Sequence, residues 1–218
     1  MKFAIRPMKS ADIPQVAEID RQAFPTMWPP TSFTRELSNK LARYFVAYED
    51  VDPALSQAAE KEAESRTGGD KRGVAGWLRG LFSTKAGAVT VTNQHVLGFA
   101  GMWCMFDEVH LTTIAVRRAC WRRGIGEALL ITVIEYAAEH GAETVTLEVR
   151  ASNFEAQALY EKYGFKPVGV RRGYYTDNRE DALIMTTDRI TSAAYQSQFQ
   201  RLKAAYARRQ VSVQLDVP

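Results

Sequence analysis

Short apolar runs rich in β-branched and aromatic residues alternate along the chain with segments whose apolar residues recur at helical spacing. The runs predict strands, and these lie at residues 3–6, 44–48, 96–105, 108–116, 144–149, 165–170 and 181–188. The helical spacing predicts helices after residue 10 and at residues 31–37, 124–140, 153–163 and 191–209. Because strands alternate with helices late in the chain, the pattern favours an α/β fold with a mixed sheet.

Residues with capping or stopping chemistry mark the expected helix ends. Ser10 is expected to cap the first helix, and Ser152 with Glu155 three residues later fits a capping box. Gly141 and Gly164 follow two of the later helices, where glycine commonly ends a helix.

Residues 51–93 interrupt this pattern with a stretch dominated by Ala, Glu, Lys, Gly and Ser. We expect a surface insertion with a helical piece near 53–66 and a mobile middle. The apolar piece at 74–82 could bind a membrane surface or a partner. It is short and carries little charge, which favours a segment folded back on its own core.

Composition places the chain among ordinary globular proteins. Of its 218 residues, 46% are hydrophobic and 24% charged, and the net charge of +3 does not by itself indicate nucleic-acid binding. Cys104 and Cys120 form no CxxC pair, and His95, His110 and His140 have no metal-ligand spacing, so neither a disulfide nor a metal is expected. No apolar run approaches a membrane span and no secretory signal is visible, which predicts a cytoplasmic protein with no membrane contact.

The most informative stretch joins an apolar strand to a basic loop and then to a helix that opens with Gly124-Ile125-Gly126. The loop carries four arginines: Arg117, Arg118, Arg122 and Arg123. The first backbone N–H groups of a helix lack internal partners and lie at its positive end, and glycines let an anion approach them. We therefore favour a diphosphate site over a solvated turn. Leu129 stands where the Rossmann fingerprint has its third glycine, and no Walker A loop is present.

This loop resembles the acetyl-CoA loop of the GNAT superfamily of N-acetyltransferases, and residues 147–153 and 158–165 resemble its second cofactor motif. Residues 23–25, 147–153, 171–175 and 179–185 resemble the narrower RimI subfamily, bacterial enzymes that acetylate the N-terminal alanine of a small-subunit ribosomal protein. The resemblance covers residues 3–50 and 95–188.

The resemblance implies a V-splayed, mixed and mostly antiparallel central sheet flanked by helices, with a surface insertion and a C-terminal helical tail. The catalytic domain would span 1–190 and a basic tail 191–218. Acetyl-CoA would lie in the splay, its diphosphate on backbone N–H groups of the loop and its pantetheine arm paired with the strand before it. The implied cofactor-binding residues are Ile114, Ala115, Val116, Arg122, Arg123, Gly124, Ile125, Gly126, Glu127 and Asn153.

One position departs from the family pattern. Trp121 stands three residues before the first glycine, where the family usually has glutamine or arginine. Because the phosphate contacts come mainly from the backbone, we expect acetyl-CoA binding to survive. For the Trp121 ring we favour packing over stacking on the cofactor.

The resemblance also assigns two catalytic roles. Acetyl transfer needs a neutral amine and a protonated leaving thiolate, hence a base and an acid. Glu148 corresponds to the general base, although a strand carboxylate can also be merely solvated. Tyr160 corresponds to the general acid at the CoA sulfur, although a helix tyrosine can also be a core aromatic.

Aromatic residues in two loops are candidates for walls of the substrate entrance. By the same resemblance these are Phe24, Pro25, Trp28, Tyr174 and Tyr175. A narrow aromatic slot would admit a chain end and exclude a lysine within a chain. Each residue could equally be an ordinary core or surface aromatic.

The leading hypothesis is an acetyl-CoA-dependent N-acetyltransferase acting on a protein N-terminus, such as that of a ribosomal protein beginning with alanine. The alternatives are acetylation of a lysine or a small-molecule amine, contact with RNA or the ribosome through the basic tail, and an inactive acyl-CoA sensor. The presence of both Glu148 and Tyr160 argues against the sensor. The sequence leaves open whether the chain is a monomer or a dimer.

Overall fold

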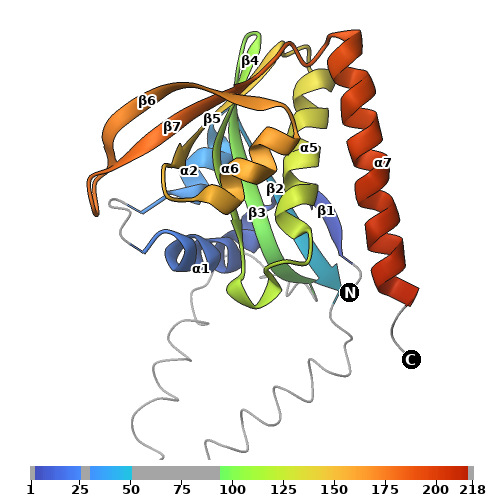
Figure 1. Ribbon diagram of the computed structural model, residues 1–218. Coiled ribbons are helices and arrows are strands. Elements are labelled where there is room, and N and C mark those ends of the chain that lie inside the picture. The colour runs from blue at the N-terminus through green and yellow to red at the C-terminus, as the bar shows by residue number, and fades with distance from the viewer. Residues whose placement is uncertain (1–2, 26–29, 51–93, 216–218) are drawn as a thin grey trace, which may run out of the picture.

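The computed structural model describes residues 3–25, 30–50 and 94–215, with side chains up to residue 209 (Figure 1). A seven-stranded sheet has the order β1-β2-β3-β4-β5-β7-β6. Its strands are β1 (Ala4–Pro7), β2 (Ala42–Asp50), β3 (Gln94–Met105), β4 (Glu108–Val116), β5 (Thr144–Arg150), β6 (Phe165–Tyr175) and β7 (Glu180–Thr187). All neighbours pair antiparallel except β4 and β5. The expected mixed, mostly antiparallel sheet is therefore confirmed.

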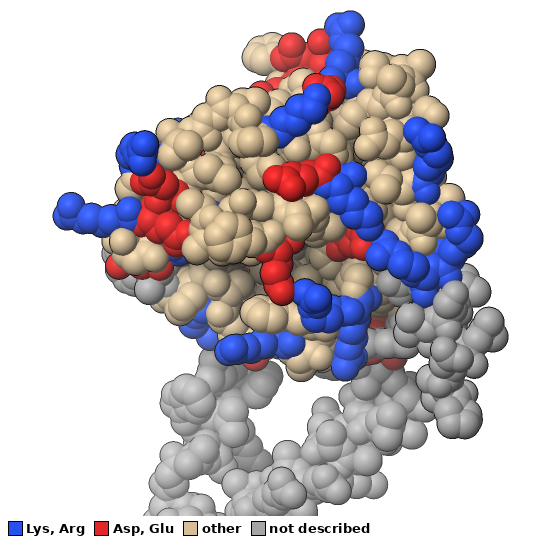
Figure 2. Space-filling view, viewed as in Figure 1, with Lys and Arg blue, Asp and Glu red and all other residues tan. Residues whose placement is uncertain are grey.

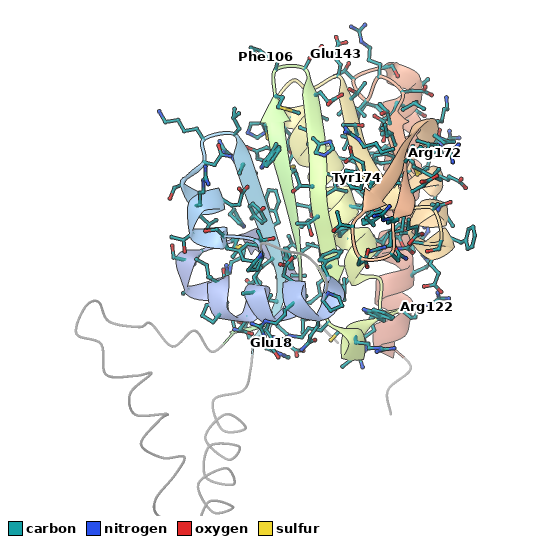
Figure 3. All side chains as sticks on the ribbon, turned by 90° about the vertical axis from the view of Figure 1, so that its left-hand side faces the viewer. Glu18, Phe106, Arg122, Glu143, Arg172 and Tyr174 are labelled. Carbon is teal, nitrogen blue, oxygen red and sulfur yellow. The ribbon has the colours of Figure 1, made fainter. Side chains whose placement is uncertain are left out.

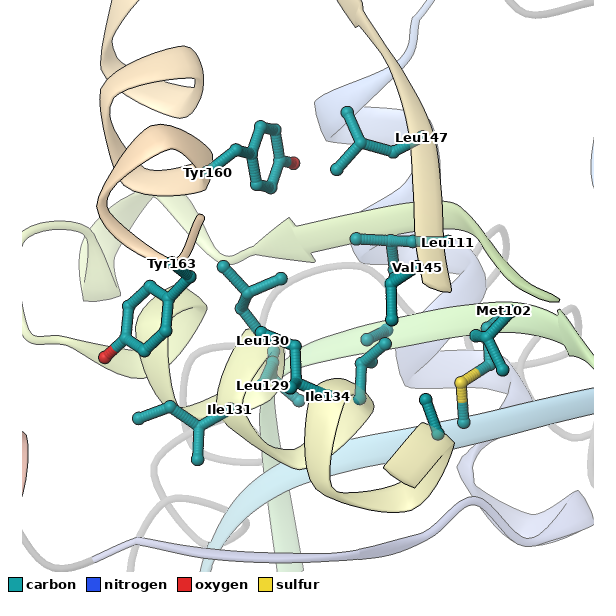
Figure 4. Packing of buried hydrophobic residues seen from close by; sticks show 14 of the residues in the cluster. Met102, Leu111, Leu129, Leu130, Ile131, Ile134, Val145, Leu147, Tyr160 and Tyr163 are labelled. Carbon is teal, nitrogen blue, oxygen red and sulfur yellow. The ribbon is translucent and has the colours of Figure 1, made fainter. Parts of the chain in front are cut away.

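Helices cover both faces of this sheet. They are α1 (Ile13–Ala23), α2 (Phe33–Ser38), α5 (Ile125–Glu139), α6 (Phe154–Lys162) and α7 (Ala193–Leu215). One hydrophobic core holds α1 and α2 side chains, and the larger one joins α5, α6 and α7 to the other face of the sheet. Figure 4 shows α5 residues such as Leu130 and Ile134 packed near Val145 and Leu147 of β5.

A β-bulge in the middle of β4 divides this strand into two halves. Gly101 of β3 pairs with Thr113, but the next β3 residue pairs with Leu111, so Thr112 is extra. The bulge reverses which side chains face α5: Leu111 belongs to the α5 core, whereas Ala115 belongs to the α1 core. Pairing of β4 with β5 stops at Leu111, just before the bulge. Beyond this point the two strands separate, which is the expected splay.

Two expected helix caps are wrong. Ser10 lies inside a 3-10 turn, and the Asp12 carboxylate instead accepts the Lys9 backbone N–H at 2.7 Å. At α6 the cap is Asn153, whose side-chain oxygen accepts the Ala156 N–H at 3.2 Å. Ser152 therefore forms no capping box.

The C-terminal helix extends past the expected end and packs on the rest of the molecule (Figure 1). Tyr195 and Phe199 are buried, and the Tyr195 hydroxyl donates to the Tyr163 carbonyl at 2.8 Å. Arg209 donates to Glu127 of α5 at 2.7 Å. These contacts attach α7 to both α5 and α6.

The predictions for the insertion at 51–93 concern residues outside those that the structure describes. Among the described helices, none is long and apolar enough to cross a membrane.

Candidate active site

The basic loop leads into α5 through a glycine in the left-handed conformation. Gly124 has a φ of +78°, which glycine adopts without strain, and the first helical hydrogen bond runs from Ala128 N–H to its carbonyl. The amides of residues 125–127 therefore precede the helical hydrogen-bond pattern and lie at the positive end of α5. A Cβ added to Gly126 would meet only the Val116 side chain, at 3.7 Å, so a ligand can approach this backbone closely. Figure 3 shows Arg122 at the opposite end of the molecule from Phe106.

The second half of β4 presents an unpaired edge next to this loop. The Arg117 N–H donates to Leu97 of β3 at 2.8 Å. Since backbone groups alternate along a strand, those of Ile114 and Val116 point away from β3, into the splay. The Trp121 indole N–H donates to the Val116 carbonyl at 2.8 Å. Trp121 thus ties the loop back to the end of β4 while its ring is more than half exposed.

Glu148 is held on β5 by two side chains, one from the adjacent strand β4 and one from β6, which lies beyond β7. Its side chain is 8% exposed, so it is not the merely solvated carboxylate considered from the sequence. One oxygen lies 3.0 Å from Nε2 of His110 on β4, and the other lies 2.9 Å from Nε of Arg171 on β6. Sequence reasoning assigned no role to His110 and missed the pairing of Arg171, since only the strand register brings them together.

Tyr160 reaches the same region from α6. Burial raises the pKa of its hydroxyl, which therefore stays protonated at neutral pH. This hydroxyl makes no hydrogen bond to any residue that the structure describes, and Figure 4 shows it directed toward Leu147. The ring lies 5.6 Å from that of Phe165, so Tyr160 is a core aromatic whose hydroxyl is still available.

The candidate base and acid approach the splay from opposite faces of β5. Leu147 and Val149 belong to the same core cluster as Tyr160 and α5. Side chains alternate along a strand, so Glu148 projects to the other face, toward α1 and α2. This arrangement suits a reaction in which one group acts on an incoming amine and the other on a leaving group.

The two tyrosines expected at the substrate entrance end β6. Tyr174 is 45% exposed and meets the half-buried Tyr175 edge to face at 5.2 Å. The Arg150 guanidinium stacks on Tyr175 at 3.9 Å, while burial raises the pKa of Tyr175 to about 12. Phe24 packs against the α1 core, and Pro25 follows it. Trp28 lies outside the residues that the structure describes.

Acidic residues after β6 are already engaged within the protein. Hydrogen bonds from Ser152, and then from Arg150, lower the pKa of Glu180 to about 2. Asp181 accepts hydrogen bonds from Arg172 and from the Gly173 N–H, both at 2.8 Å. These carboxylates hold the β6–β7 turn in place.

Two expected cofactor residues have structural partners of their own. The Asn153 side-chain oxygen caps α6. The Glu127 carboxylate accepts hydrogen bonds from Lys162, Tyr163 and Arg209, so only its backbone N–H is available to a ligand at the start of α5.

Comparison with known proteins identifies this geometry. A model of the Acetyltransferase (GNAT) family matches residues 60–165. A Bacillus subtilis (strain 168) protein, provisionally named a ribosomal protein bS18-alanine N-acetyltransferase, is 32% identical over 185 residues, 84% of this chain and 94% of the relative. The chain belongs to the GNAT family.

Two other acetyltransferases are similar to this chain. An N-alpha-acetyltransferase of Sulfurisphaera tokodaii is 33% identical over 84% of this chain and 92% of the relative. The crystal structure of the Escherichia coli ribosomal-protein-S18-alanine N-acetyltransferase matches with a TM-score of 0.57 and 27% identity, covering 86% of this chain and 94% of that one. As a GNAT enzyme, this chain is an acetyl-CoA-dependent N-acetyltransferase.

The site fits acetyl-CoA by its chemistry. The backbone of Ile114 and the N–H of Val116 can pair with an extended amide-bearing arm, while the Val116 carbonyl already accepts the Trp121 indole N–H. The uncrowded backbone at Gly126 can accept a phosphate. Among the described residues, no group of three or more His, Cys, Asp or Glu side chains could hold a metal ion.

Proposed function

We propose that this chain transfers the acetyl group of acetyl-CoA to the N-terminal α-amino group of a ribosomal protein that begins with alanine. The main support is the 32% identity along 94% of the B. subtilis relative, whose name gives the alanine of a ribosomal protein as the acetylated residue. The E. coli enzyme of the same name is 46% identical over 95 residues, which are 43% of this chain and 64% of the relative. These relatives do not favour the alternative substrates, a lysine side chain or a small-molecule amine.

Glu148 accepts a proton from the incoming amine in this proposal. An α-amino group has a pKa of about 8, so much of it is protonated at neutral pH, and only the neutral form can attack. Glu148 lies on the face toward α1 and α2, away from the cofactor loop, and both of its oxygens are fixed in position. The nitrogen then bonds to the acetyl carbon as the carbon–sulfur bond breaks.

Tyr160 donates its proton to the departing sulfur. Because burial raises the pKa of this hydroxyl, it keeps its proton until a thiolate forms beside it. The hydroxyl has no competing acceptor among the residues that the structure describes. CoA therefore leaves as the thiol.

Backbone groups hold acetyl-CoA for this transfer. The amides of residues 125–127 would bind its diphosphate, assisted by Arg122 and Arg123, and the β4 edge would bind its pantetheine arm. Asn153 would contact that arm through the part of its side chain that does not cap α6.

Five aromatic and proline residues would form the substrate entrance on the amine side: Phe24, Pro25, Trp28, Tyr174 and Tyr175. Exposure of Tyr174 next to the pair of Arg171 and Glu148 supports this role, because a peptide that reaches Glu148 from this side passes the tyrosine.

The tail at 191–218 is proposed as an appendage to a catalytic domain spanning 1–190. Figure 2 shows Lys and Arg side chains along the edge of the molecule that α7 forms. Lys203 and Arg209 form ion pairs with Glu135 and Glu127 of α5. Because these two charges already have partners, we do not propose a separate RNA-binding function for the tail.

The test measures thiol release from acetyl-CoA with two peptides of identical sequence. One has a free N-terminal alanine and an acetylated lysine, and the other has a blocked N-terminus and a free lysine. Activity on the first peptide alone supports the proposal. Activity on the second alone would assign lysine acetylation instead.

A further inference from the structure

The carboxylate of Glu148 contacts two side chains whose presence a general base alone does not require. Its two oxygens are bound separately, one by His110 and one by Arg171. The side chain of His110 is 20% exposed and that of Arg171 is 55% exposed, so the buried carboxylate is connected to solvent through its partners. The transfer mechanism described above uses neither partner.

Strand register explains how His110 reaches Glu148. In the parallel pair of β4 and β5, His110 lies opposite Thr146, and Glu148 is two residues further along β5. Their neighbours Leu111 and Leu147 point together into the α5 core, so His110 and Glu148 share the opposite face. They are diagonal neighbours on either side of Leu111 and Leu147, the last pair before the splay opens.

The two partners differ in what they can do with a proton. Arginine stays protonated at any physiological pH and can only hold the carboxylate. Histidine gains and loses a proton near neutral pH, and each ring nitrogen can bind a different partner. Nε2 of His110 faces Glu148, whereas its Nδ1 makes no hydrogen bond to any residue that the structure describes.

We propose that His110 relays to solvent the proton that Glu148 accepts from the substrate amine. The inference rests on the proposed function in one respect, that the enzyme acetylates an amine. His110 is a positioning residue in this scheme, because it acts on the substrate only through Glu148. Arg171 holds the other oxygen and keeps the carboxylate oriented.

Protons balance in this scheme. The ammonium loses one proton to Glu148, which passes it to Nε2 of His110 in the tautomer that carries its hydrogen on Nδ1. The imidazolium then releases the Nδ1 proton to water, and exchange of the remaining ring proton from Nε2 to Nδ1 through water restores the starting tautomer. Attack then forms the carbon–nitrogen bond and breaks the carbon–sulfur bond. The amine nitrogen loses a second proton as the amide forms, and this proton replaces the one that Tyr160 gives to the thiolate. One proton is released per acetyl group transferred.

Several charged and titratable groups face this pair and shape its pH dependence. From β6 these are Arg171, Tyr174 and Tyr175. Burial raises the pKa of both tyrosines, and the negative charge of Glu148 contributes to the increase. On β3, Trp103 is paired with His110, and its indole N–H donates to Glu36 of α2 at 3.0 Å. Glu148 remains the group in direct contact with His110.

The experiment compares wild type with His110→Gln, because glutamine can still donate an N–H to Glu148 but cannot titrate. His140→Gln is the matched control, since His140 lies at the exposed end of α5. We measure kcat against pH with the free N-terminal alanine peptide. For His110→Gln we expect kcat to fall by roughly 100-fold near neutral pH, the low end of the usual range for proton transfer. We also expect this loss to become smaller towards about pH 9, where the amine is already neutral, with KM for acetyl-CoA unchanged.

Two results would overturn the relay: wild-type activity in His110→Gln, or a pH profile of this variant that runs parallel to that of wild type. The contact between His110 and Glu148 would then be a structural hydrogen bond only. If wild type acetylates only the lysine peptide, the proposed function fails, and the same comparison on that peptide still decides the relay. Ring-nitrogen NMR gives a readout free of activity. Glu148→Gln should move the Nε2 resonance of His110 and leave that of His140, and an unmoved His110 resonance contradicts the pairing.

Discussion

Replacing Tyr160 by phenylalanine separates the two roles open to this residue, general acid and core aromatic. The substitution removes only the hydroxyl, which makes no hydrogen bond to the described residues, and keeps the ring against Phe165. Because the removed hydroxyl has no partner among these residues, the substitution leaves none of their groups unsatisfied, so the melting temperature should not fall. If the hydroxyl protonates the thiolate, kcat should fall by about 100-fold to 10,000-fold, which is roughly 3 to 5.5 kcal/mol in the barrier.

Tyr163, the residue directly after α6, provides the matched control. Its hydroxyl donates to the Glu127 carboxylate at 2.7 Å, and Glu127 joins α5 to α6 and α7. Tyr163→Phe should therefore cost about 1.5 to 3 kcal/mol of stability, the usual range for a hydrogen bond to a charged group. The melting temperature should fall by roughly 3 to 10 °C while kcat changes little.

The assay pairs initial rates of thiol release at saturating acetyl-CoA with thermal unfolding of each variant. The two substitutions should have opposite signatures, with Tyr160→Phe losing turnover and Tyr163→Phe losing stability. Wild-type turnover in Tyr160→Phe would refute the acid role. A lowered melting temperature with retained turnover would instead make Tyr160 a structural residue.

Three further predictions test the base, the cofactor loop and the fold. Glu148→Gln should lower kcat/KM more at about pH 7 than at about pH 9, where the amine is already neutral, and a constant ratio would contradict the base role. Gly126→Ala should raise KM for acetyl-CoA about tenfold at unchanged melting temperature, because the added Cβ meets only a side chain at 3.7 Å but projects toward the phosphate site. Asp12→Asn should cost about 3 to 5 kcal/mol, because it breaks a buried pair with Arg6. Burial opposes ionisation of Asp12, yet hydrogen bonds from Arg6 and Lys9 lower its pKa, so this stability is present above about pH 4 and is lost as pH falls through the lowered value. Urea unfolding of the variant should show less loss of stability in acid than wild type.

Local signals in the sequence were sufficient for the glycines at the helix ends, although not for the N-terminal caps expected at Ser10 and Ser152. Gly141 and Gly164, expected as helix stops, have φ values of +79° and +85°, a conformation that favours glycine. Gly124 opens α5 with a φ of +78° for the same reason. These positions depend on a few neighbouring residues, so a pattern of a few residues predicts them.

Features that depend on contacts between distant strands could not be predicted in this way. No glycine or proline in β4 marks the bulge at Thr112. The bulge nevertheless reverses which side chains of β4 point toward α5, and the pairing of β4 with β5 ends just before it. The pairing of Glu148 with His110 and Arg171 requires the register of β4 with β5 and the order of β5, β7 and β6. The sequence therefore identified Glu148 through a motif but not the residues that hold it.

Trp121 illustrates how the loop keeps its shape despite a departure from the family pattern. The resemblance implies glutamine or arginine here, and both side chains carry N–H donors. Tryptophan also carries one, and its indole N–H donates to the Val116 carbonyl, while Arg118 lies 5.6 Å over the ring. A donor at this position fastens the loop to the end of β4, so that the loop turns into α5 with its first amides next to the open strand edge. The departure therefore changes the residue and preserves the hydrogen bond that fixes the geometry of the candidate cofactor site.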